Sequence, residues 1–107
     1  MEAVVDAYNA EERAMGWYYY LEGRLKVPFK ARCKTERVVS PLRKREEVSV
    51  LGMAPEEECG SEMFVRVRWR GRSLAVPLSQ LEPLAGNRET KEAVADWHYW
   101  LGRGYEF

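Results

Sequence analysis

The sequence predicts a single domain of the α+β class. Short runs that alternate apolar and polar residues fill the middle of the chain, whereas both ends show the spacing of helices. The chain has 107 residues, of which 46% are hydrophobic and 32% are charged, which is typical of a globular protein and not of a disordered one. We therefore expect residues 1–107 to share one modest hydrophobic core.

A first helix is predicted over residues 4–21. Its middle, Glu11–Ala14, consists of good helix formers, and Gly23 suits the end of the helix. The aromatic run Trp17–Tyr20 is too apolar to be fully exposed, so we expect it to lie in the core with the second aromatic run, Trp97–Trp100. If such a patch were exposed instead, it would mark a surface for a protein partner.

In four segments, apolar and polar residues alternate along the chain, which is the pattern of half-buried strands. In the first, Leu25–Cys33, apolar side chains on one face alternate with Lys and Arg on the other, and Pro28 favours an edge position or a bulge. The other segments are residues 47–53, 63–70 and 73–77. In the third segment, Val and Trp face one way, whereas the opposite face carries Arg66, Arg68 and Arg70.

The last third of the chain completes the predicted fold. Ser79–Leu81 has the composition of a single helical turn before a short last strand, and a final helix is predicted over residues 88–101 with Asn87 as its cap. Short antiparallel strands with a helical turn before the last one are typical of a small SH3-like β-barrel. The predicted fold is therefore a four- or five-stranded SH3-like β-barrel flanked by N-terminal and C-terminal helices.

Charge and composition exclude several classes of function. The formal net charge is zero, which gives no general attraction to nucleic acid or to a membrane. The chain shows neither a signal peptide nor a membrane span, so we expect a cytoplasmic protein in which Cys33 and Cys59 are reduced. Cys33 is predicted to face inward from its strand, and the three glutamates before Cys59 should raise the pKa of its thiol. Two cysteines and one histidine fall short of a structural zinc site. Nothing in the sequence gives His98 a catalytic partner, so we expect no enzyme activity.

An acidic segment between two predicted strands is the main functional candidate. Its four carboxylates belong to Glu56, Glu57, Glu58 and Glu62. Pro55 and Gly60 bend the chain around the first three of them. Such an acidic run is often simply solvated, but calcium takes roughly six to eight oxygen ligands and tolerates a flexible loop. The regular Asp and Asn spacing of an EF-hand is absent, so a calcium site here would have another geometry.

Five blocks of the sequence, taken in order, carry a resemblance to a known family. They are Glu11–Glu22, Pro28–Cys33, Val50–Glu56, Val76–Leu81 and Asp96–Trp100. These blocks resemble the CcbP-type calcium-binding proteins first named in cyanobacteria, and the resemblance spans residues 6–107. It implies a small cytoplasmic protein that is not an enzyme, with an SH3-like barrel and with calcium bound by acidic side chains as a buffer or a sensor. In this chain, the segment with Glu56, Glu57, Glu58 and Glu62 resembles the acidic segment of that family, and the density of carboxylates there makes these four residues the predicted metal ligands.

Other charged residues bear on the predicted site. Glu11 and Glu12 could add ligands if the first helix lies near the acidic segment, although Glu residues at a helix start also stabilise the helix dipole. Asp96 has the position of a surface carboxylate. Arg43 and Arg45 lie close to the acidic segment along the chain, so we expect them to weaken calcium binding by repulsion.

A basic stripe provides the rival function. Arg66, Arg68 and Arg70, together with Arg72, Lys30 and Arg32, could bind nucleic acid or a protein partner by neutralising its negative charges. Aromatic residues do not interleave with the stripe, because Trp69 belongs to the opposite face. Charged side chains on strands also serve to prevent aggregation. We therefore expect calcium, and not nucleic acid, to be the ligand.

Overall fold

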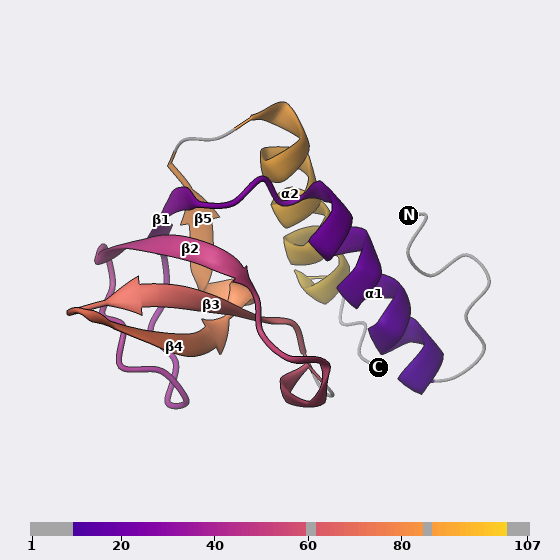
Figure 1. Ribbon diagram of the computed structural model, residues 1–107, viewed down its shortest axis with the longest axis horizontal. Coiled ribbons are helices and arrows are strands. Elements are labelled where there is room, and N and C mark those ends of the chain that lie inside the picture. Colours follow the sequence, from indigo (N-terminus) through magenta and orange to yellow (C-terminus); the bar gives the residue numbers. More distant parts are fainter. Residues whose placement is uncertain (1–9, 60–61, 85–86, 103–107) are drawn as a thin grey trace.

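The chain folds as an α+β domain, as predicted. Figure 1 shows the computed structural model, which describes residues 10–59, 62–84 and 87–102, with side chains from residue 14 onward. In chain order, the described elements are α1 (Ala10–Arg24), β1 (Phe29–Cys33), β2 (Glu47–Met53), η2 (Glu56–Glu58), β3 (Phe64–Trp69), β4 (Arg72–Pro77), η3 (Leu78–Gln80), β5 (Leu81–Pro83) and α2 (Arg88–Gly102).

The five strands form one antiparallel sheet in the order β4-β3-β2-β1-β5. Strands β4 and β5 lie at opposite edges and do not pair in the described part of the chain, so the sheet is open. The predicted closed SH3-like β-barrel is therefore not confirmed. Strand β5 has only three residues, pairs with β1 from Leu81 to Pro83, and ends at a proline that has no N–H to extend a ladder.

Strand β1 is shorter than the predicted strand and lies in the interior of the sheet, between β2 and β5. Because Pro28 cannot donate a ladder hydrogen bond, the strand begins only at Phe29 and leaves the proline outside it. Its alternation is as predicted: Phe29, Ala31 and Cys33 are buried, whereas Lys30 is exposed. The buried thiol of Cys33 is free, as expected.

A bulge in β2 directs the chain toward the acidic segment. Val50 pairs with Val67, but the next pair along the ladder joins Gly52 to Arg66, so Leu51 is an extra residue. Gly52 has a φ of 154°, a conformation that glycine adopts more easily than other residues. Bulges bend a strand and increase its twist, and this one lies just before the turn that carries the carboxylates.

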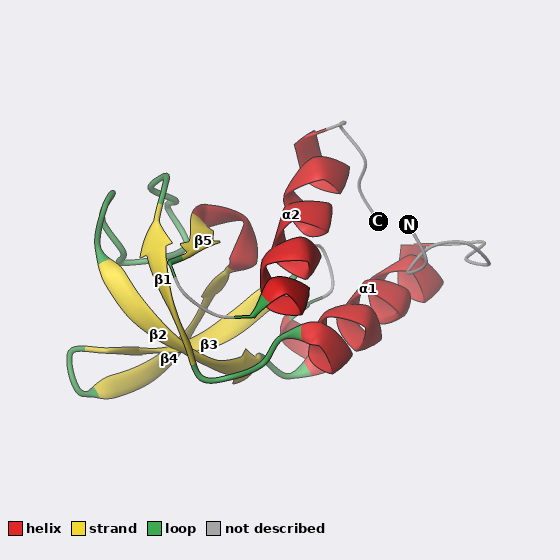
Figure 2. Cartoon of the chain, turned by 90° about the horizontal axis from the view of Figure 1, so that it is seen from above, coloured by secondary structure: helices red, strands yellow, loops and turns green. Residues whose placement is uncertain are grey.

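The two helices pack together on one side of the bent sheet (Figure 2), where α1 contacts β2 and α2 contacts β5 and η3. Trp17 and Trp97 are fully buried between them with ring centroids 5.1 Å apart, and Trp100 is nearly buried beside them. This cluster confirms that most of the aromatic residues are core. Tyr19 and Tyr99 are exceptions, with more than half of their surfaces exposed.

Helix α2 has nearly its predicted bounds, but α1 runs through Gly23 instead of ending before it. Helix α1 continues to Arg24, beyond the predicted end, and residues 4–9 of the predicted helix lie outside the described residues. At the start of α2, Asn87 Oδ1 accepts a hydrogen bond of 2.8 Å from the backbone N–H of Thr90, which is the predicted cap. Neither described helix combines the length and the apolarity needed to cross a membrane.

Candidate functional site

Three of the four predicted ligands form a 3-10 turn, η2, which is called the acidic turn below. Pro55 starts it in an extended conformation, and the N–H groups of Glu58 and Cys59 donate to the carbonyls of Pro55 and Glu56 at 2.9 and 3.0 Å. The loop is closed at its base, where Ala54 N–H donates to the carbonyl of Phe64 at 3.0 Å. The acidic turn is thus held on a short, hydrogen-bonded loop between β2 and β3.

Cys59 anchors the acidic turn to the core. Its side chain is only 2% exposed, and its sulfur accepts a hydrogen bond of 3.4 Å from the N–H of Phe64. Burial raises the pKa of the Cys59 thiol, and the nearby charges of Glu58 and Glu56 raise it further. The thiol is therefore protonated at neutral pH, as the neighbouring glutamates predicted, and serves a structural purpose.

The carboxylates of the acidic turn point outward and are not neutralised. Glu56, Glu57 and Glu58 are all exposed, and no Lys or Arg of the described residues lies within ion-pairing distance of them. Successive residues of a 3-10 helix are about 120° apart around its axis, so the three side chains point in different directions. For that reason, the described residues contain no ready cluster of three or more acidic, His or Cys side chains that could hold a metal ion.

Helix α1 lies beside the acidic turn and adds two groups that sequence reasoning missed. The hydroxyl of Tyr19 donates a hydrogen bond of 3.0 Å to Glu56 Oε1, and this bond raises the pKa of Tyr19. Burial raises the pKa of Tyr18, and the charge of Glu22, three residues beyond Tyr19 along the helix, raises the pKa values of Tyr18 and Tyr19 further. Glu22 is exposed, so its carboxylate is available near the turn. Helical spacing could have grouped Tyr19 with Glu22, but not with a loop 37 residues away.

Glu62, the fourth predicted ligand, is engaged by a basic side chain. Arg37 donates to both of its carboxylate oxygens, at 3.2 and 2.7 Å, and Ser79 Oγ donates to Glu62 Oε1 at 3.1 Å. The side chain of Glu62 is only 19% exposed. The hydrogen bonds to Glu62 raise the pKa of Arg37, so the guanidinium group stays charged. Calcium would have to displace a guanidinium group to reach this carboxylate.

The remaining candidates have other surroundings. The side chains of Glu11 and Glu12 lie outside the described part of the chain. Asp96 accepts a hydrogen bond from the hydroxyl of Tyr20 and so ties α2 to α1. Neither Arg43 nor Arg45 lies within ion-pairing distance of a described carboxylate. The basic side chain that contacts a predicted ligand is Arg37, which the sequence did not single out.

The predicted basic stripe is present only in part on the outer face of the sheet, because Arg70 stacks on the ring of Trp69 and Arg72 is the cross-strand partner of Trp69, on the opposite face. Arg66 and Arg68 are exposed on β3, and one cross-strand row runs from Lys30 through Ser49 and Arg68 to Ser73. Small neutral residues therefore separate the basic side chains of this row. Trp69 points the other way, as expected, and its indole N–H donates to Glu46 Oε2 at 2.9 Å.

The donors of the acidic turn suit a hard cation. Carboxylate and backbone carbonyl oxygens are the ligands that calcium prefers, whereas the nearest sulfur, that of Cys59, is buried and protonated. The carboxylates of Glu56–Glu58 can turn toward an ion because they are exposed and have no basic partner among the described residues; only Glu56 would first have to give up its hydrogen bond from Tyr19. In chemistry and freedom of movement, the donor set therefore fits calcium.

Comparison with known proteins agrees with this chemistry. A family model, Calci_bind_CcbP, described as calcium binding, matches residues 1–101. The crystal structure of Anabaena CcbP is 45% identical, with a TM-score of 0.86, covering 99% of this chain and 87% of that one. A calcium binding protein in the calcium-binding form is 43% identical, with a TM-score of 0.87, covering 100% of this chain and 88% of that one. No curated protein matches significantly.

The match to the family spans nearly the whole chain. The two solved structures resemble this chain both in sequence and in the arrangement of their helices and strands. Because identity above two fifths over nearly the full length accompanies the same fold, the likeness is more than a shared architecture. This chain belongs to the CcbP family of calcium-binding proteins.

Proposed function

We propose that this protein is a non-enzymatic calcium-binding protein, a buffer or a sensor, whose site is centred on the acidic turn. The proposed ligands are Glu56, Glu57, Glu58 and Glu62, with backbone carbonyls of the same loop, in a geometry unlike that of an EF-hand. One observation carries the proposal: three adjacent exposed carboxylates have no basic partner among the described residues. Membership of a calcium-binding family supports it.

A cation is expected to relieve the repulsion within the acidic turn. Adjacent carboxylates repel one another, and a doubly charged ion between them converts that repulsion into attraction. Because the side chains of η2 fan out, the 3-10 turn has to loosen before several of them can share one ion. Glu62 has to leave Arg37, and Glu22, whose charge acts on the same Tyr19 that contacts Glu56, is the carboxylate that we propose takes its place. These costs should keep the affinity modest.

The surroundings of the reactive side chains support a role without catalysis. Both ring nitrogens of His98 have partners, with Nδ1 3.1 Å from Lys34 Nζ and Nε2 3.3 Å from the carbonyl oxygen of Leu78. The thiol of Cys59 is buried and its pKa is raised. Neither group is free to act as a base or a nucleophile at neutral pH.

Replacing Glu56, Glu57 and Glu58 together by Gln tests the proposal. The variant keeps the shape of the side chains but removes their charge, so titration calorimetry in low-salt buffer should show calcium binding weakened by about tenfold or more. A matched control replaces Glu47, Glu89 and Glu92, exposed glutamates elsewhere on the surface, by Gln. The control loses the same charge and should bind calcium nearly as well as the wild-type protein.

Two results would contradict the proposed site. If both triple variants lose affinity equally, calcium responds only to the overall charge of the protein. If the acidic-turn variant binds like the wild type, the ion is held elsewhere, and Glu11, Glu12 and Asp96 are the next carboxylates to replace.

A further inference from the structure

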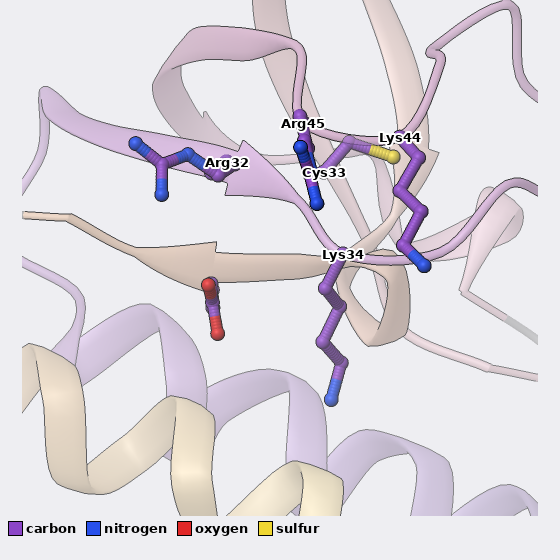
Figure 3. Close-up of a pocket in the computed structure, with 6 residues that line it drawn as sticks. Arg32, Cys33, Lys34, Lys44 and Arg45 are labelled. Carbon is purple, nitrogen blue, oxygen red and sulfur yellow. The ribbon is translucent and has the colours of Figure 1, made fainter.

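An open pocket at the end of β1 is lined mainly by basic side chains. It has a volume of about 570 Å³, and its lining residues are Arg32, Cys33, Lys34, Lys44, Arg45 and Glu82. Figure 3 shows that Lys44 and Arg45 reach it from one loop, while Arg32 and Lys34 flank Cys33 at the end of the strand. Four cations thus surround a space that contains one carboxylate, that of Glu82.

These cations are poorly neutralised by the protein. No carboxylate of the described residues lies within ion-pairing distance of Lys34, Lys44 or Arg45. Arg32 has only a 3.4 Å contact with Glu47, between two side chains that are each about half exposed, and such a pair contributes little. Bringing like charges together without counter-ions costs free energy, so the pocket favours an added anion.

Lys34 is held in place by a neutral partner. A carbonyl oxygen can only accept, so the contact between His98 Nε2 and the carbonyl of Leu78 places the ring hydrogen on Nε2. His98 Nδ1 is then free to accept a hydrogen bond from Lys34 Nζ, 3.1 Å away. This bond orients the ammonium group without neutralising it and leaves its other two N–H groups for a ligand.

The backbone around Arg45 is fixed in a costly conformation. Arg45 has a φ of 74°, in the left-handed region that non-glycine residues rarely adopt. Its N–H donates to the carbonyl of Cys33 at 2.7 Å, and the N–H of Cys33 donates to the carbonyl of Glu46 at 2.8 Å. The carboxylate of Glu46 in turn accepts from the N–H of Arg43 at 3.0 Å. Strain of this kind accumulates at functional sites, and here it aims an arginine at the pocket.

We propose that this pocket binds a small anion that carries two or more phosphate groups. Arginine offers a planar fork that matches phosphate oxygens, and lysine offers a strong point charge, so the two together suit a ligand with several phosphate oxygens. The pocket is wide and open, which suits a diphosphate or triphosphate better than a single small ion. Glu82 at the rim can accept a hydrogen bond from a hydroxyl group of the same ligand.

The test is a calorimetric titration with inorganic pyrophosphate at low salt. The buffer must be free of calcium, because calcium itself binds pyrophosphate. Arg45→Gly removes one charge and relieves the backbone strain, so the variant should fold while binding weakens by about tenfold or more, the usual size of a lost charge-assisted hydrogen bond. Lys44→Gln should also weaken pyrophosphate binding. This variant removes a charge from the pocket but leaves the strained backbone at Arg45 unchanged.

Arg70→Gly is the matched control for Arg45→Gly. Arg70 also has a positive φ, 50°, and also sits in an exposed turn, but it stacks on the ring of Trp69 instead of lining the pocket. This variant loses the same charge and the same kind of strain, so it should bind pyrophosphate within about twofold of the wild type. The proposal is overturned if the wild type does not bind pyrophosphate, or if Arg70→Gly loses as much affinity as Arg45→Gly.

Discussion

Single residues show how far chemistry can be predicted from the sequence. Cys33 was expected to be a buried thiol and Cys59 to have a raised pKa, and both expectations are confirmed. Alternation along β1 buries Cys33, whereas burial raises the pKa of Cys59 and the adjacent glutamates raise it less. The partner of Glu62 was missed. Arg37 lies 25 residues earlier in the chain, and no local pattern can indicate a contact that depends on how two loops meet.

The contact between Arg37 and Glu62 predicts a gain of calcium affinity. If Glu62 is a ligand, Arg37→Gln removes its competitor and should strengthen binding by about fivefold, in keeping with the value of a partly exposed ion pair. Titration calorimetry of Arg37→Gln against Arg88→Gln separates this effect from a change in overall charge, because Arg88 pairs with Glu92 on α2 and not with Glu62. Equal affinities in the two variants would show that Glu62 does not bind the ion.

His98 predicts a dependence of stability on pH. Burial, and then the charge of Lys34, lower the pKa of His98 in the folded protein. As the pH falls, the imidazole of His98 is therefore protonated in the unfolded chain before it is protonated in the folded protein. The free energy of unfolding should then decrease as the pH drops below about 6.5 toward the folded-state pKa. Urea unfolding of the wild type between about pH 7.5 and 5.5 should show a larger loss than His98→Gln. If the free energy of unfolding falls equally with pH in the wild type and in His98→Gln, His98 is not the origin of the pH dependence.

Secondary-structure elements were largely predictable where a pattern repeats within one segment. The alternation in β2, β3 and β4 and the cap at Asn87 placed those elements within a residue or two. The acidic turn was predicted as an irregular loop, yet it forms a 3-10 helix that directs its carboxylates apart. Periodicity cannot predict so short an element, because one turn contains too few residues to repeat a pattern.

The basic face of β3 predicts a negative result. Its exposed arginines alternate with buried valines, which is the pattern of any half-solvated strand, and the protein has no net charge. We therefore expect no gel shift with single- or double-stranded nucleic acid, even at low salt. If a shift occurs and replacing Arg66 and Arg68 by Ala flattens its salt dependence, the face is a genuine polyanion site.

At the scale of the whole molecule, the positions of the strands along the chain were easier to predict than the closure of the sheet. Local alternation identifies strands, but closure depends on the bulge at Gly52, on the shortness of β5 and on the helices that cover one side of the sheet. Prediction of the candidate site was limited in the same way, because its contacts join distant parts of the chain. Tyr19 and Glu62 each make their key contact with a residue more than twenty positions away, so sequence reasoning located the acidic segment but not its neighbours.

Calcium should stabilise the whole fold, and magnesium should do so less. A ligand at about 100 times its dissociation constant adds about 2.7 kcal/mol to the free energy of unfolding, which for a domain of this size raises Tm by about 10 °C. Magnesium requires a tight octahedral shell and keeps its waters, so a loosely arranged set of glutamates should bind it more weakly. Thermal unfolding at equal concentrations of the two ions measures the difference. The variant with Gln at Glu56, Glu57 and Glu58 should lose the calcium shift while unfolding at a similar temperature without calcium. Equal shifts from both ions would indicate general charge screening, which acts without a built site.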